Sequence, residues 1–180
     1  MILNHDQRIF ESASKEPGRY AFHGVLFRTE GDVTTATATD GKQLVRIEVT
    51  LQDGEVLPED GVLLSSSDIK SGWGRGKGDR ILRVLEGVWK LGVGNQISTI
   101  DVLEGEFPNV EAVIPAPSST RRMSFDVRIL ARMAKAAGAD SVTLEVPEFH
   151  AGQVKGPIRV TLRETESGEQ MGVLMPITVD

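Results

Sequence analysis

Residues 33–49 read VTTATATDGKQLVRIEV, and this stretch decides the fold class of the chain. The segments 33–39 and 45–49 alternate with a period of two, which is typical of half-buried β-strands. Between them, Asp40-Gly41 is a strong hairpin signal, because glycine adopts positive φ angles without a Cβ clash. The stretch therefore predicts an antiparallel β-hairpin.

Similar strand signals return along the rest of the chain. Residues 141–146 and 158–163 alternate equally well, and the shorter segments 81–85, 88–93 and 97–103 are bounded by glycine or polar residues. Their β-branched residues also favour strands. We therefore expect a β-rich chain.

Two helices are predicted from capping residues. Asn4 can cap a helix over residues 5–16, and Asp126 can cap a second helix over 127–137 that Gly138 ends. We expect one face of the second helix to be apolar, formed by Val127, Leu130, Ala134 and Ala137.

A third helical start lies near residues 65–68, and the glycines from Gly72 onward limit it to a single turn followed by a basic loop. The three helix starts fall near residues 4, 65 and 126, which is a period of about 60 residues. Each start is followed by two or three strands. The chain therefore reads as three helix-plus-β-meander units of an α+β protein, with the helices on one face of antiparallel sheets.

Charge is divided unevenly along the chain. The net charge is −6, yet residues 70–83 and 121–135 together carry ten basic and two acidic residues, a net +8, which leaves −14 for the other 151. Such segregation indicates a positive face suited to a polyanion. The alternative is that two solvated segments happen to be basic.

The composition argues against catalysis. With 39% apolar and 26% charged residues, the chain is typical of globular proteins. The absence of cysteine excludes disulfides and thiolate zinc sites and fits a reducing cytoplasm. The three histidines are scattered along the chain, and the sequence shows no catalytic constellation. It also shows no signal peptide and no apolar run of membrane-spanning length. We expect a protein that is not an enzyme and uses no cofactor or metal.

Four motifs resemble those of the bacterial sliding clamp, the β subunit of DNA polymerase III. Residues 24–31 (GVLFRTEG) resemble its G-x-L-F-E-T-E-G strand, and residues 37–44 (TATDGKQL) resemble its V-A-T-D-G-H-R-L hairpin. Residues 104–115 (EGEFPNVEAVIP) resemble its interdomain linker, and residues 172–177 (GVLMPI) resemble its terminal V-V-M-P-M strand. The motifs occur in the clamp's order and imply the DNA-clamp fold.

The resemblance spans nearly the whole chain but only about half of a clamp subunit, which has three domains of two units each. It implies that residues 1–114 form a complete domain like the clamp's middle domain. Residues 115–180 resemble the second half of the last domain. A family ring has twelve units, so the resemblance favours a tetramer of this three-unit chain, with a dimer as the alternative; two 115–180 segments would meet in an isologous contact.

The resemblance also implies a peptide-binding pocket where the middle and last domains meet. Lys42 and Gln43 replace the His-Arg that is usual in the family. The alternative is that Val173, Met175 and Ile177 are core residues of a last strand. The implied pocket residues are Phe22, Thr39, Gly41, Leu44, Pro115, Val173, Met175, Pro176 and Ile177.

In clamps the helices line the hole through which duplex DNA passes, and phosphate contacts there carry no base readout. The alternative is that these long side chains are merely solvated. The implied DNA-facing residues are Arg8, Lys15, Arg128, Arg132 and Lys135 on the helices, with Lys70, Arg75, Lys77 and Arg80 on the adjoining loop.

The sequence thus predicts a sliding clamp, a processivity factor that encircles duplex DNA as a homo-oligomer and tethers a DNA polymerase or other DNA enzyme. Two alternatives stay open. One is a non-encircling decoy or adaptor that captures clamp-binding peptides or a host clamp, and the other is a plain DNA-binding module. Whether a clamp loader is also a partner stays open as well.

Overall fold

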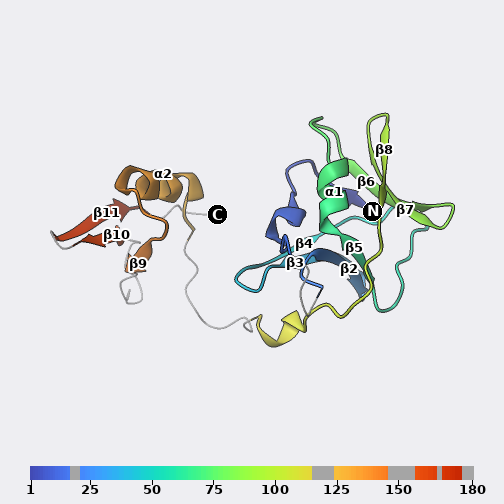
Figure 1. Ribbon diagram of the computed structural model, residues 1–180, viewed down its shortest axis with the longest axis horizontal. Helices are drawn as coiled ribbons and strands as arrows, with labels where there is room; N and C mark the ends of the chain where they lie inside the picture. Colours follow the sequence, from blue (N-terminus) through green and yellow to red (C-terminus); the bar gives the residue numbers. More distant parts are fainter. Residues whose placement is uncertain (17–20, 115–123, 146–156, 166–167, 176–180) are drawn as a thin grey trace. The chain divides into compact units, whose positions relative to one another are not determined.

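The structure is a computed structural model that describes residues 1–16, 21–114, 124–145, 157–165 and 168–175. The chain divides into two compact units, which we call unit 1 (Met1–Ile114) and unit 2 (Pro115–Asp180). Each unit combines antiparallel strands with helices (Figure 1), so the predicted α+β class with few helices is confirmed.

The first sheet of unit 1 contains the predicted hairpin. Its strand order is β4-β3-β2-β5, all antiparallel, and Thr39 lies opposite Leu44 beside the turn. β5 was not predicted from the sequence, and it lies directly before the third helical start. The strands are β2 (Gly24–Glu30), β3 (Val33–Thr39), β4 (Leu44–Glu48) and β5 (Val62–Ser65).

The second sheet of unit 1 has the order β1-β6-β7-β8 and is also antiparallel. Three of its strands match predicted segments, although the last one ends at Ile100 rather than at residue 103. The strands are β1 (Ile2–Leu3), β6 (Arg80–Leu85), β7 (Val88–Val93) and β8 (Gln96–Ile100).

The two sheets of unit 1 exchange short β-strands. We call the short strand that precedes the helix of each meander its leading β-strand; these are β1 and β5. β1 begins the chain but pairs with β6, with Ile2 opposite Ile81. β5 precedes the second meander but pairs with β2, with Leu64 opposite Val25. The meander β2–β3–β4 therefore gains β5 at one edge, and the meander β6–β7–β8 gains β1.

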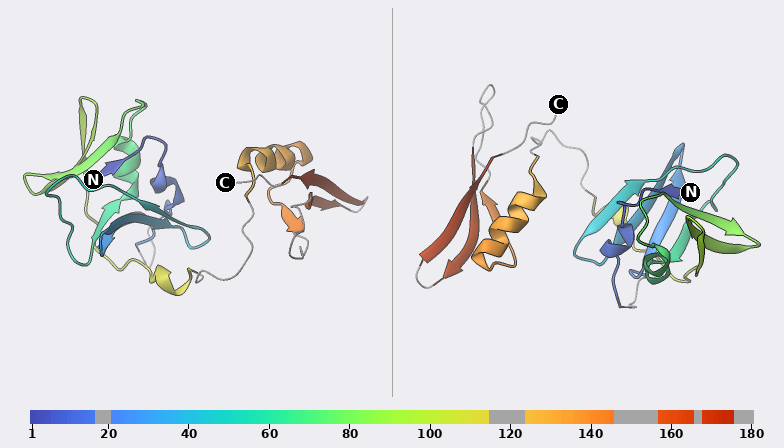
Figure 2. Two further views of the ribbon diagram at one scale, coloured as in Figure 1. Left: turned by 180° about the vertical axis from the view of Figure 1, so that it is seen from behind. Right: turned by 90° about the horizontal axis from the view of Figure 1, so that it is seen from above.

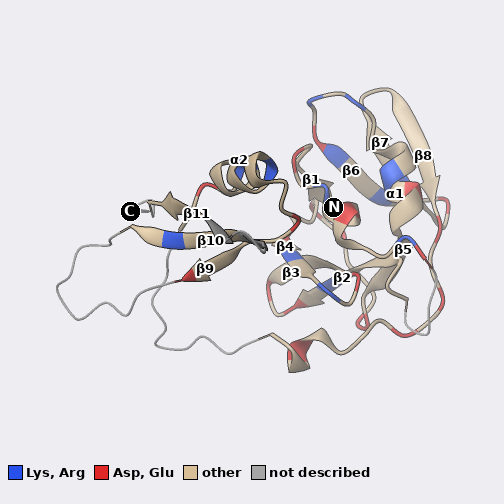
Figure 3. Ribbon diagram, turned by 60° about the vertical axis from the view of Figure 1, so that its left-hand side comes forward, with Lys and Arg blue, Asp and Glu red and all other residues tan. Residues whose placement is uncertain are grey.

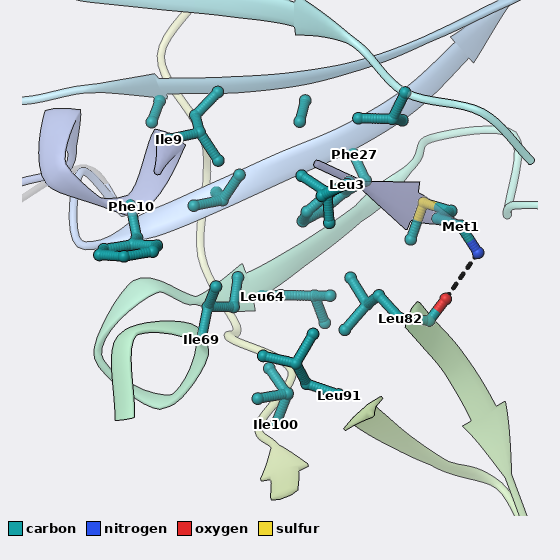
Figure 4. Close-up of a cluster of buried hydrophobic side chains, with 14 of the residues drawn as sticks. Met1, Leu3, Ile9, Phe10, Phe27, Leu64, Ile69, Leu82, Leu91 and Ile100 are labelled. Carbon is teal, nitrogen blue, oxygen red and sulfur yellow. Dashed lines mark hydrogen bonds between the residues drawn. The ribbon is translucent and has the colours of Figure 1, made fainter. Parts of the chain in front are cut away.

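A single apolar core joins the two halves of unit 1. Figure 4 shows side chains from both sheets and from the helices in contact at its centre, and the N-terminal ammonium of Met1 donates to the Leu82 carbonyl at 2.6 Å. Two of the core aromatic rings, Phe10 and Trp73, meet edge to face with centroids 5.0 Å apart. The halves therefore form one domain core.

The helices of unit 1 differ from the predicted ones. The helix expected over residues 5–16 is wrong, because only the 3-10 helix η1 (Ile9–Ser12) forms there. The Asn4 side chain does not cap it, and Ala13 is already extended. The second helix, α1 (Ser66–Gly72), is longer than the expected single turn and is capped by the Ser65 hydroxyl, which accepts from the Asp68 N–H at 3.3 Å.

Unit 2 places one helix on a three-stranded antiparallel sheet of order β11-β10-β9 (Figure 2). The predicted helix is confirmed, because Asp126 accepts from the Arg128 N–H at 2.9 Å and Gly138 ends it with a φ of 61°. The elements are α2 (Val127–Ala137), β9 (Thr143–Glu145), β10 (Ile158–Thr165) and β11 (Gly168–Leu174).

One residue of the expected apolar face of α2 is misplaced. Val127 is 72% exposed, and the half-buried side chains are instead Ile129, Leu130, Met133, Ala134 and Ala137. Met133 lies against Gly172 of β11, where a Cβ atom would come within 2.3 Å of its Cε. Gly172 therefore permits the close packing of α2 on β11. None of the described helices is long and apolar enough to cross a membrane.

Candidate peptide groove and DNA-facing surface

The turn between β3 and β4 is organised by two side chains. The Asp40 carboxylate accepts hydrogen bonds from the backbone N–H groups of Lys42 (2.9 Å) and Gln43 (3.0 Å), and these bonds lower the pKa of Asp40. The Thr39 hydroxyl donates to the Gln43 carbonyl at 2.6 Å, and Gly41 adopts a φ of 85°. The turn therefore has a defined shape in which glycine is needed.

The segment that follows β8 is anchored to the first sheet. The Ala21 N–H donates to the Glu106 carbonyl at 3.1 Å. Farther along, Arg46 of β4 forms an ion pair with Glu111 in the short 3-10 helix η2 (Val110–Ala112), and the hydrogen bond from Arg46 lowers the pKa of Glu111. The linker motif is thereby fixed beside the β3–β4 turn.

A groove of about 360 Å³ lies where this linker meets the turn. All four pocket residues expected in unit 1 line it together: Phe22, Thr39, Gly41 and Leu44. The turn and the linker supply the rest: Lys42, Gln43, Pro108, Asn109, Val110 and Val113. An apolar floor with polar edges suits a short peptide. We call this feature the unit 1 groove.

Sequence patterns do not single out the linker side of the groove. Pro108 and Val113 belong to the motif over residues 104–115, from which only Pro115 is expected in the pocket. The available signal is the motif's apolar content, since Val113 is 70% exposed and has no place in the core. Pro115 itself lies outside the described residues.

Unit 2 exposes apolar side chains on the face of its sheet that is turned away from α2. Along β11, Leu174 is buried toward the helix, whereas Met171 and Val173 point to the other face, and Met175 follows them. Val173 and Met175 are 58% and 59% exposed, so these two residues are not part of a core within the described part of the chain. The other two expected pocket residues of the tail, Pro176 and Ile177, lie outside the described residues.

The exposed face of α2 is cationic. Arg128, Arg132 and Lys135 are all exposed, and Figure 3 shows basic positions in blue on α2. Arg128 is held by Asp126, which accepts from its Nε at 3.0 Å and from its Nη2 at 2.8 Å; this pairing lowers the pKa of Asp126 to about 2 and raises that of Arg128. Within the described part of the chain, Arg132 and Lys135 form no ion pair, so their charges are available to a ligand.

Arg80 does not face DNA, which corrects the expectation. It is only 1% exposed, because its side chain lies on the face of β6 that also carries the buried Leu82. Its guanidinium lies 5.1 Å from the centroid of the Trp73 ring, and its Nε donates to the Trp73 carbonyl at 3.0 Å. Its other donors reach carbonyl groups in the loop that precedes β6: those of Gly74, Gly76 and Gly78. Arg80 therefore organises the basic loop from inside.

The remaining expected DNA-facing residues are all on the surface of unit 1. Arg8 precedes η1, pairs with Glu11 at 3.1 Å and lies over the Phe10 ring, so its charge is partly satisfied. The other four are exposed: Lys15 after η1, Lys70 on α1, and Arg75 and Lys77 on the loop that Arg80 organises. Because only residues 9–12 are helical, Arg8 and Lys15 do not form an aligned helical stripe, which corrects that expectation.

Two further features of the described surface are a larger pocket and the distribution of possible metal ligands. A pocket of about 810 Å³ over the outer face of β2 and β3 is larger than the unit 1 groove, but the Arg46–Glu111 pair occupies its polar wall. Within the described ranges, no three His, Cys, Asp or Glu side chains gather in a way that could hold a metal ion. The groove and the cationic surfaces are therefore the candidate sites.

Comparisons with known proteins point to one kind of relative. No protein-family model matches the chain. The sequence is 28% identical over 127 residues to a beta sliding clamp of Chlamydia muridarum, across 64% of this chain and 32% of that clamp. A beta sliding clamp of Caulobacter crescentus superposes with a TM-score of 0.70 and 24% identity, covering 98% of this chain and 50% of the clamp.

The fold is that of the bacterial sliding clamp. A sliding clamp of Bacillus subtilis gives the same result, with a TM-score of 0.68 and 17% identity over 98% of this chain and 48% of that clamp. The resemblance expected from the four motifs is thus confirmed in sequence and in fold. The clamp-like chain spans about half the length of the clamps that it matches.

Proposed function

We propose that this chain acts as a sliding clamp that holds a DNA polymerase or another DNA enzyme on duplex DNA. The observation that carries the proposal is the unit 1 groove, where four residues implied by the resemblance meet the linker in one cavity. Short apolar peptides suit such a groove. In unit 2, Met175 is exposed, and methionine adapts to varied partners at little strain. The protein would act as a tether in the cytoplasm and not as an enzyme.

The cationic face of α2 supports a role on DNA. Arg132 and Lys135 are exposed and unpaired among the described residues, on a chain whose net charge is −6. A ring needs only weak phosphate contacts, which are independent of sequence and therefore permit sliding. Topological linkage, rather than affinity, would keep the acidic protein on its DNA.

Encirclement requires several copies of the chain. In this proposal unit 1 corresponds to the complete middle domain of a clamp, and unit 2 corresponds to half of the last domain. Twelve helix-plus-meander units in a ring would take four copies, and a dimer is the smaller assembly compatible with paired unit 2 segments. A clamp loader is then a further candidate partner.

The proposal predicts retention on closed DNA. The protein, loaded on nicked circular DNA with or without a clamp loader, should stay bound through gel filtration at moderate salt. It should be released when a restriction enzyme linearises the circle, because a ring slides off free ends. Equal retention on circular and linear DNA would instead indicate ordinary binding and contradict encirclement.

The groove assignment predicts a local loss of peptide binding. Leu44→Ala should weaken the binding of a fluorescent clamp-binding peptide by about tenfold, because removing buried methyl groups costs 1–2 kcal/mol of contact. Fluorescence anisotropy measures the change. Val56→Ala is the control, because Val56 is 89% exposed and outside the groove. Equal affinity of both variants and the wild type would remove the groove assignment.

A non-encircling adaptor is the second candidate. The residues that line the unit 1 groove all belong to unit 1, so peptide capture there does not require a closed ring. Such an adaptor would bind the peptide in the Leu44 experiment but would show no preference for circular over linear DNA.

A further inference from the structure

The strand exchange in unit 1 follows a rule that unit 2 leaves incomplete. β2 and β6 are each the first strand after a helix, and each gains a leading strand from the other meander at its outer edge. β9 holds the same position after α2. Among the described strands, β9 pairs with β10 alone.

The segment before α2 shares one feature with the leading strands of unit 1. In unit 1, the leading residues Ile2 and Leu64 each form a bridge just beyond the last strand of their own meander, to Thr50 and Val102. Ser124, just before α2, also forms a single β-bridge. In unit 1 no leading strand pairs with the first strand of its own meander. The segment before α2 is therefore not the natural partner of β9 in the same chain.

Helix starts show what the missing partner would bury. Ser66 and Val127 are each the first residue of a helix, directly after the capping residues Ser65 and Asp126. Ser66 is 8% exposed, and its N–H donates at 3.1 Å to the carbonyl of His23, in the other half of unit 1. Val127 is 72% exposed, although it is the more apolar of the two.

Unit 2 also buries fewer apolar side chains than unit 1. In the described parts of the chain, unit 1 holds twenty-two buried apolar side chains, whereas unit 2 holds three: Ile158, Val160 and Leu174. No residue of α2 is buried, although the shorter α1 buries three. A three-stranded sheet with one half-covered helix buries too little apolar surface to be a finished core.

We propose that a second copy of this chain completes unit 2, by adding the segment before its α2 to the outer edge of β9 and by covering Val127. This inference rests on the homo-oligomeric clamp proposed above and names its contact. Unit 1 does not supply the missing strand, because β1 and β5 are already paired with β6 and β2. Among the described parts of the chain, unit 2 alone has a leading segment and an open edge that match, and a two-fold axis between two copies satisfies both at once.

The rule also fixes the register of the contact. The bridge-forming residue of each leading strand lies opposite the second residue of its partner strand: Ile2 opposite Ile81, and Leu64 opposite Val25. Applied to unit 2, the rule places Ser124 of one copy opposite Leu144 of the other. Because the chain has no cysteine, introduced thiols report this pairing without background.

The first test measures association. Sedimentation equilibrium at 1–100 µM is expected to give about 39 kDa or a multiple for the wild type, twice 19.5 kDa. Val127→Glu should shift the chain to a monomer, because two carboxylates would be buried in the contact. Glutamate suits a helix N-terminus, so α2 itself should be unharmed. Ala136→Glu, on the opposite side of α2, should leave the mass unchanged.

The second test is independent of stability. A 1:1 mixture of Ser124→Cys and Leu144→Cys chains should give a disulfide-linked dimer on mild oxidation, whereas each variant alone should not. A mixture of Ser124→Cys and Ala136→Cys chains is the matched control and should not crosslink.

The outcomes separate this inference from the proposed function. A monomeric wild type, or Val127→Glu chains that associate and crosslink normally, would overturn the contact. A dimer that crosslinks as expected but is not retained on circular DNA would support the contact and contradict encirclement alone.

Discussion

Replacing Arg80 with methionine is expected to lower the free energy of unfolding of unit 1 by about 2–4 kcal/mol. Methionine keeps much of the buried aliphatic stem but has no donors for the carbonyl groups that the guanidinium satisfies. The Trp73 carbonyl lies in the core and would lose its partner, and the stacking on the Trp73 ring would also be lost. Gly76 and Gly78 are exposed, so water can replace part of the loss there.

Thermal and urea unfolding followed by tryptophan fluorescence measure this effect. Arg83→Met is the matched control, since Arg83 lies on the same strand but is exposed, and its replacement should change stability by less than about 0.5 kcal/mol. Arg80→Lys should lie between the two, because a lysine offers a point charge rather than a planar fork of five donors. Equal stability of the Arg80→Met and Arg83→Met variants would show that the buried guanidinium contributes nothing net.

The fate of Arg80 illustrates what local sequence signals miss. In the sequence it is one of five basic residues within residues 70–83, and this charge run predicts a position on the cationic surface. The two-residue period of β6 carried the contrary signal, because Arg80 lies on the same face as Leu82, which is fully buried. At this position strand periodicity indicates the location of the side chain better than the local density of charge does.

Elements with their own local determinants were predictable. The β3–β4 hairpin is encoded by Asp40 and Gly41, and α2 by Asp126 and Gly138, and these residues act as expected. The helix over residues 5–16 failed because its cap does not form and the segment instead buries Ile9 and Phe10 in the shared core. β1 and β5 are short, and only pairing with distant strands defines them.

The hairpin side of the unit 1 groove was predictable from the sequence, and the linker side was not. Thr39, Gly41 and Leu44 lie on one hairpin, so a single motif locates them together. The linker residues reach the groove because Glu111 binds Arg46, which is sixty-five positions away in the chain. No local pattern reports a contact of that separation.

Reversing two charges on α2 is expected to have the largest effect on DNA. The double variant Arg132→Glu, Lys135→Glu should weaken association with a 40-base-pair duplex on the order of 60-fold at 0.1 M salt. The slope of log affinity against log salt should fall by roughly 1.8, because each phosphate contact contributes about 0.9. Arg128 is a weaker target, since Asp126 already neutralises much of its charge.

The matched control reverses the same number of charges elsewhere on the chain. Arg83 and Lys90 lie opposite each other on β6 and β7, on the side of the sheet that faces away from the core. Arg83→Glu with Lys90→Glu changes the net charge of the chain by the same amount. If the α2 face guides the duplex, only the α2 variant should lose affinity and salt dependence, and both should keep their affinity for the peptide. Equal losses would mean that net charge, and not the helical face, governs the interaction, and the DNA-facing role of α2 would then have to be abandoned.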